Sequence, residues 1–206
     1  MLPLAGCYAL QAAVGQADVL SRSAPIAEVM ADPQTPEAVR VRLDLTLQAR
    51  AFAVQELGLP DARSFRKYAD LERPYAVWNV VATPEFSVEP RRWCFPVAGC
   101  VAYRGYFDES KARAQAERLA RRGDDVAVGG VATYSTLGRL PDPVFSTMLG
   151  WTDARFVGTI FHELAHERLY VPGDSEFSEA FASVVEQEGL RLWLLARGDG
   201  AGLECL

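Results

Sequence analysis

The only two histidines of the 206-residue chain, His162 and His166, stand four positions apart with Glu163 between them. On a helix, positions i and i+4 lie on one face, so both imidazoles point in the same direction. Glu163 projects from the neighbouring turn, where its carboxylate can accept a proton from water. Two nitrogen ligands beside a general base form the H-E-x-x-H pattern of zinc peptidases. The segment predicts Zn²⁺ on His162 and His166 with Glu163 as catalytic base; the alternative is two surface histidines on a charged helix.

A catalytic zinc normally has three protein ligands and an open fourth position. Because the chain contains no further histidine, the third ligand must be a carboxylate or a thiolate. Glu179 is the best candidate, since Pro172-Gly173 allows the chain to return antiparallel after His166. Its neighbours are apolar and indicate a buried stretch, where Zn²⁺ would neutralise an otherwise costly carboxylate: Phe177, Ala180 and Phe181. Glu176 and Glu186 remain alternatives, and Asp174 is expected to cap the following helix.

The donor that stabilises negative charge on a scissile carbonyl is less well defined by the sequence. Such a donor must face the developing oxyanion from the protein side. Tyr134, Tyr170 and Tyr103 are the candidates, and each could equally be a core or rim aromatic.

The composition is that of a globular protein, with 50% apolar and 23% charged residues. The length predicts one domain over residues 1–206. A net charge of −6 and dispersed basic residues give no indication of a nucleic-acid surface.

The predicted elements indicate an α+β fold with an N-terminal helical hairpin, a small mixed sheet and a zincin-like pair of active-site helices. Thr35 and Pro36 predict a helix start, and Gly58 its stop. The helices are expected over residues 9–30 (broken near Pro25), 36–57, 108–122, 153–170 and 175–196. The strands are expected over residues 75–81, 100–107 and 126–134.

The cysteines bear on the cellular compartment. Leu4-Ala5-Gly6-Cys7 is similar to a bacterial lipobox, which predicts lipidation of Cys7, although only three residues precede it where a signal peptide needs more. A small-residue N-terminus with a free cysteine is the alternative. Cys94 and Cys100 flank a turn-rich stretch and predict either a disulfide or two buried apolar side chains.

Several segments together resemble the bacterial putative aminopeptidase family, over residues 7–194. They are Trp93-Cys94-Phe95-Pro96-Val97-Ala98-Gly99-Cys100, Tyr103-Arg104-Gly105-Tyr106-Phe107, Tyr134-Ser135-Thr136-Leu137-Gly138, Phe161-His162-Glu163-Leu164-Ala165-His166 and Glu179-Ala180-Phe181-Ala182. The resemblance implies a gluzincin-type metallopeptidase in which His162, His166 and Glu179 bind zinc and Glu163 is the base. It also implies a lipoprotein of the periplasm, membrane-anchored through Cys7 at the outer membrane, with peptides as substrates.

The chain departs from the family pattern at two places. Ser178 stands where members usually have Asn before the ligand glutamate, and residues 198–206 look like a truncated tail. Residues 1–7 look like the remnant of a lipoprotein signal. The expected activity is hydrolysis of peptide bonds by an aminopeptidase; a non-catalytic envelope lipoprotein with a structural zinc site is the alternative.

Overall fold

The computed structural model describes residues 3–95 and 99–204, and for residues 3–7, 95 and 99 it describes the backbone alone. The chain forms two compact units. Unit 1 comprises residues 1–22 and 71–134, and unit 2 comprises residues 23–70 and 135–206. The expectation of one domain over residues 1–206 stays a prediction.

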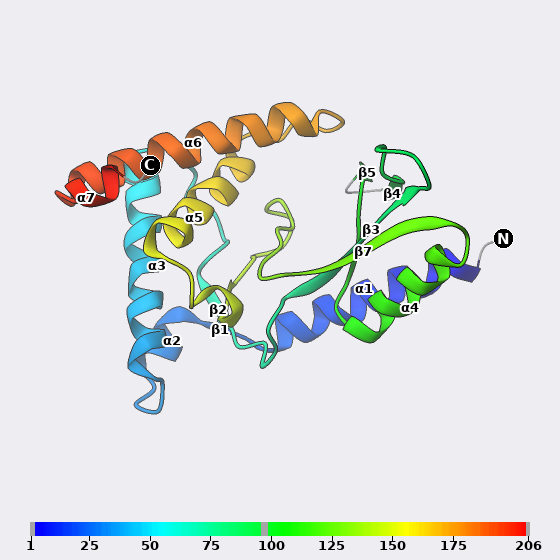
Figure 1. Cartoon of the computed structure of the whole chain (residues 1–206). Coiled ribbons are helices and arrows are strands. Elements are labelled where there is room, and N and C mark those ends of the chain that lie inside the picture. Colours follow the sequence, from blue (N-terminus) through cyan, green and yellow to red (C-terminus); the bar gives the residue numbers. More distant parts are fainter. Residues whose placement is uncertain (1–2, 96–98, 205–206) are drawn as a thin grey trace. The chain divides into compact units, whose positions relative to one another are not determined.

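Unit 1 is built on an antiparallel sheet in the order β6-β3-β7. The strands are β3 (Val77–Pro84), β6 (Arg104–Tyr106) and β7 (Asp124–Val131). Helix α4 (Glu109–Ala120) packs on this sheet (Figure 1). Helix α1 (Pro3–Ser21) contacts β6. The core between sheet and helix includes Trp78, Val80 and Tyr106. Alternate residues of β3 point to the same face of the sheet, so its apolar residues Trp78 and Val80 both reach this core.

A short hairpin of β4 (Trp93–Phe95) and β5 (Gly99–Val101) completes unit 1. Cys94 and Cys100 lie opposite each other in the register of the hairpin and form a disulfide. Of the two expected roles, a disulfide or two buried apolar side chains, the structure therefore has the disulfide. Because β5 and β6 are separate, the single strand expected over residues 100–107 is wrong.

Unit 2 is mainly helical, with a small mixed sheet in the order β1-β2-β8. Strand β1 (Ser23–Pro25) pairs antiparallel with β2 (Lys67–Ala69), and β8 (Val144–Phe145) pairs parallel with β2. The helices include α2 (Ile26–Ala31), α3 (Glu37–Gln55), α5 (Asp153–Arg168) and α6 (Ser175–Ala196), followed by the short α7 (Gly200–Leu203). A 3₁₀ turn, Ser146–Met148, precedes α5.

The α+β class and the small mixed sheet are confirmed, while the N-terminal hairpin takes a different form. The expected first helix is divided by β1, so α1 belongs to unit 1 and only α2 packs against α3 in unit 2. Thr35 does not cap α3, because its hydroxyl donates to the carbonyl of Val29 at 2.7 Å. Pro36 occupies the cap position instead.

Helix α5 lies along α6 and also contacts α3 (Figure 1). Phe161 of α5 is fully buried between Phe52 of α3 and Trp193 of α6, with ring centroids 6.0 Å and 6.3 Å away. Asp174 caps α6 as expected, accepting from the backbone amide of Phe177 at 3.0 Å. These contacts hold the two helices that carry the predicted ligands.

Cys7 lies within α1, but its side chain is outside the described part of the structure, so its lipidation stays a prediction. Within the described residues, none of the helices combines the length and the apolar character needed to cross a bilayer.

Candidate metal centre

Two histidines of α5 and one glutamate of α6 converge in unit 2. The Nε2 atoms of His162 and His166 are 3.1 Å apart. Glu179 places Oε2 3.3 Å from Nε2 of His162 and Oε1 3.5 Å from Nε2 of His166. Ligand atoms of all three side chains lie within 4.8 Å of one another. The predicted set His162, His166 and Glu179 therefore comes together in one cluster.

These separations fit a divalent cation with tetrahedral coordination. Ligand atoms bonded to Zn²⁺ at about 2.0–2.1 Å stand about 3.3 Å apart in a tetrahedron. The Nε2–Nε2 separation of 3.1 Å and the 3.3 Å from Nε2 of His162 to Oε2 of Glu179 are close to that value. The 3.5 Å contact to Nε2 of His166 is made by the other carboxylate oxygen, Oε1. Two Nε2 atoms and a carboxylate are also the donor types that zinc prefers. The residues present thus fit the metal that the sequence predicts.

Both imidazoles face the cluster with Nε2, but among the described residues only His162 has a partner at its outer nitrogen; Nδ1 of His166 is buried without one. His162 donates from Nδ1 to Oε2 of Glu186 at 2.9 Å, which directs its other nitrogen inward. His166 is buried, and burial lowers the pKa of its imidazole, with the charge of Glu179 opposing that change. A metal binds the neutral imidazole, so a lowered pKa favours the form that binds.

Glu186, which the sequence left as an alternative third ligand, lies on the outer side of His162. It contacts the outer nitrogen of His162, while Glu179 faces both inner nitrogens. Carboxylates that accept from the outer nitrogen of a ligating histidine fix its tautomer and orientation. The sequence placed both glutamates on one helix, but only the crossing of α5 and α6 distinguishes them.

The burial expected around Glu179 is wrong. Its side chain is 59% exposed, and Phe177 is 49% exposed. Helix α6 buries a different face, which includes Ser178 and Ala182. Glu179 therefore stands at the solvent side of the cluster, and Glu176, the other alternative, is also exposed.

Glu163 differs from the ligands in its surroundings. Its carboxyl oxygen Oε2 is buried without a hydrogen-bond partner among the described residues. Burial raises the pKa of the Glu163 carboxyl; the charges of Asp142 and Glu179 act in the same direction, while Ser135 and His162 act against it. A carboxyl with a raised pKa beside a metal cluster is suited to accept and return a proton.

A loop over residues 135–142 brings Ser135 to Glu163, a feature missed from the sequence. Asp142 is buried at the base of this loop and accepts from the backbone amide and the hydroxyl of Thr136 at 2.7 Å and 2.9 Å. The loop needs glycine at position 138, because φ there is +72° and a Cβ atom would stand only 2.8 Å from Cγ of Glu167. The sequence feature that could have indicated this loop is Ser135-Thr136 followed by Asp142. Residues of these types close turns through side-chain hydrogen bonds to backbone amides.

Ser178, where the family pattern has Asn, ties the connection between α5 and α6. Its hydroxyl accepts from the amide of Val171 at 3.0 Å and donates to the carbonyl of Asp174 at 2.8 Å. The hydroxyl thus supplies both a donor and an acceptor that close the turn before Glu179.

The three candidate oxyanion donors fall in different units. Tyr170 follows α5 in unit 2, with its ring centroid 6.1 Å from that of His166. Tyr134 and Tyr103 belong to unit 1, where Tyr134 donates to Gln16 at 2.8 Å and Tyr103 is 46% exposed. Their roles stay predictions, and Tyr170 is the candidate adjacent to the cluster.

A family model described as "Putative aminopeptidase" matches residues 7–204. No curated protein and no solved structure gives a significant match to the chain.

Proposed function

Since the chain belongs to the putative aminopeptidase family, we propose that it is a zinc-dependent peptidase of the gluzincin type. The observation that carries the proposal is the convergence of His162, His166 and Glu179 beside the buried carboxyl of Glu163. When bound, Zn²⁺ lowers the pKa of water toward about 7 and polarises the scissile carbonyl.

Glu163 is the group that moves the proton in this proposal. Its Oε2 accepts a proton from water as the hydroxyl adds to the carbonyl carbon. It then returns that proton to the amine nitrogen as the carbon–nitrogen bond breaks. Burial supports this role, because it favours the protonated form that the second step requires. Tyr170 is the nearest candidate to donate to the oxyanion in the same unit.

The number of ligands favours catalysis over a structural zinc site. Structural zinc sites usually have four protein ligands, whereas catalytic sites have three and an open position. Within the described residues, the cluster contains three such side chains. A fourth ligand could come from a thiolate or a second glutamate, but Cys94 and Cys100 are joined to each other, and Glu186 contacts the outer nitrogen of His162.

The disulfide supports an extracytoplasmic location, because disulfides persist in oxidising compartments. We therefore keep the periplasmic lipoprotein, anchored through Cys7 and acting on peptides, as part of the proposal. Mass spectrometry of the protein from bacterial membranes tests it; an unacylated Cys7 would contradict the anchor.

The substitution Glu163→Gln tests the mechanism. Because glutamine cannot accept the proton, we expect hydrolysis of a peptide library to fall by a factor of about 10²–10⁴. Zinc content, measured by atomic absorption, should stay at the wild-type level. Glu176→Gln is the matched control and should change neither quantity, since Glu176 is exposed. Full activity of the Glu163→Gln protein would remove Glu163 from the mechanism.

Aminopeptidase specificity requires its own measurement. If the enzyme needs the free amino terminus, it should cleave a peptide with a free amine and leave its N-acetylated form intact. Equal cleavage of both forms would contradict the exopeptidase assignment and leave the zinc peptidase in place.

A further inference from the structure

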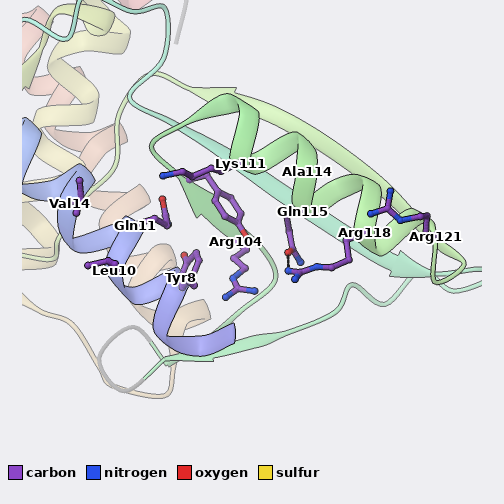
Figure 2. Close-up of a pocket in the computed structure, with 11 residues that line it drawn as sticks. Tyr8, Leu10, Gln11, Val14, Arg104, Lys111, Ala114, Gln115, Arg118 and Arg121 are labelled. Atoms are coloured by element: carbon purple, nitrogen blue, oxygen red, sulfur yellow. Dashed lines mark hydrogen bonds between the residues drawn. The ribbon is translucent and has the colours of Figure 1, made fainter. Parts of the chain in front are cut away.

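Unit 1 contains a pocket of about 540 Å³ that is separate from the metal cluster of unit 2. Figure 2 shows residues of α1 on one side and residues of α4 on the other, with Arg104 of β6 between them. The side chain of Gln11 joins α1 to this strand, donating to the carbonyl of Gly105 at 3.2 Å. The pocket is thus built by elements that contact each other within one unit.

The charge of this pocket is opposite to that of the whole chain. Its lining includes four basic residues and no acidic one, whereas the chain carries a net charge of −6. Lys111 and Arg118 lie two turns apart on one face of α4, Arg121 follows at the end of this helix, and Arg104 comes from β6. A cluster of this kind selects an anion.

Three of these cations have no carboxylate within ion-pair distance in the described part of the chain, although the charge of Lys111 helps to lower the pKa of Asp108. Arg121 pairs with Glu117 at 3.7 Å. In the described part of the chain, no ion pair is formed by Arg104, Lys111 or Arg118. Arg118 donates instead to the amide oxygen of Gln115. Lys111 and Arg118 extend from α4 toward the side of α1 (Figure 2). Their positive charge is therefore available to a ligand.

Arg104 is held in place before any ligand binds. Its guanidinium carbon lies 3.9 Å from the ring centroid of Tyr8, a cation–π contact. Its Nε is buried and has no hydrogen-bond acceptor among the described residues. The guanidinium is thus preoriented by the ring of Tyr8, and a planar guanidinium matches the oxygen atoms of a phosphate.

An apolar surface lies beside the cations. Leu10 and Val14 are one turn apart on α1, line the pocket and are 65% and 61% exposed. Helix α1 carries a single charged residue, Asp18. An exposed apolar flank next to basic side chains is typical of protein surfaces that bind anionic membranes. An acidic peptide would use the cations but not this flank.

We propose that this pocket binds the phosphate of an anionic phospholipid, with Arg104, Lys111 and Arg118 around the phosphate and the acyl chain along Leu10 and Val14. The proposal concerns unit 1 and does not depend on zinc or on peptide hydrolysis. It also does not require acylation of the chain.

The test measures co-sedimentation of the full chain with phosphatidylcholine vesicles, with and without phosphatidylglycerol. The chain carries Cys7→Ser, so that acylation cannot contribute. We expect binding only to the vesicles that contain phosphatidylglycerol. Replacing Arg104, Lys111 and Arg118 by Gln together should lower the partition coefficient about a hundredfold. The control replaces Arg63, Arg113 and Arg122 by Gln, which removes the same charge outside the pocket and should have a much smaller effect.

A second set of measurements distinguishes binding in the pocket from attraction by the surface charge of the whole chain. Leu10→Gln should weaken vesicle binding while circular dichroism shows an unchanged fold. Equal losses in the two triple variants would overturn the pocket. Calorimetric binding of inorganic phosphate without vesicle binding, or complete displacement from vesicles by a soluble acidic peptide, would overturn the lipid assignment.

Discussion

At the scale of single residues, the site depends on which nitrogen of His162 faces the cluster. The hydrogen bond from Nδ1 to Glu186 leaves Nε2 free to face Nε2 of His166 and the carboxylate of Glu179. Without it, the ring could rotate or adopt the other tautomer. Glu186 is therefore a positioning residue for a ligand and not itself a member of the cluster.

The substitution Glu186→Gln should lower the affinity for zinc by about 10–100-fold, because the outer partner of His162 loses its negative charge. Competition with a chromophoric chelator measures this affinity. Glu188→Gln is the matched control on the same helix, since Glu188 pairs with Arg191 on the surface. Equal affinities for the Glu186→Gln and unsubstituted proteins would show that the contact does not position the ligand.

At the scale of elements, the site depends on the packing of α5 against α3 and α6. Phe161 immediately precedes the first ligand and is fully buried among aromatic rings. Gly189 of α6 allows the close approach, since a Cβ atom there would stand 3.0 Å from the ring of Phe161. The helix that presents both histidines is therefore anchored by its opposite face.

Phe161→Ala should lower the free energy of unfolding by about 3–5 kcal/mol, because it removes a buried ring and leaves a cavity. Urea denaturation followed by circular dichroism measures the change. Phe177→Ala is the comparison: because Phe177 is half exposed, its effect should be about 1 kcal/mol or less. Similar losses for both variants would contradict the burial of Phe161 between α3 and α6.

At the scale of the whole molecule, the metal cluster belongs to one of two units, each of which is made of two separate stretches of the sequence. All three ligands and Glu163 lie in residues 135–206 of unit 2, and this stretch packs with residues 23–70 from earlier in the chain. Residues 71–134, which include the disulfide hairpin, belong to unit 1.

Zinc should slow hydrogen exchange in α5 and α6 and leave α4 and β3 unchanged, because a ligand stabilises the folded form of the unit that binds it. At a free zinc concentration of about 100 times Kd, the expected stabilisation is about 2.7 kcal/mol. Exchange measured by mass spectrometry, with and without zinc, checks this result. Protection confined to unit 1 would contradict the proposed ligands.

Much of the local structure was predictable from short stretches of sequence. Helices α4, α5 and α6 begin after Asp108, Thr152 and Asp174, whose side chains cap them. Strands β1, β2 and β8 were not predicted, since they have two or three residues each and exist only through partners far away in the chain. A periodic pattern cannot develop over so few residues.

The sequence by itself determined the pair of imidazoles and the acid between them, because four-residue spacing on a helix places His162 and His166 on one face. It favoured Glu179 over Glu186, seven residues further along the same helix, on an expectation of burial that the structure contradicts, so it gave no sound basis for the choice. Only the tertiary structure made that assignment, since the crossing of α5 and α6 sets which carboxylate meets the inner nitrogens and which the outer one. Packing between helices is a property of residues distant in the chain, and no local pattern encodes its geometry.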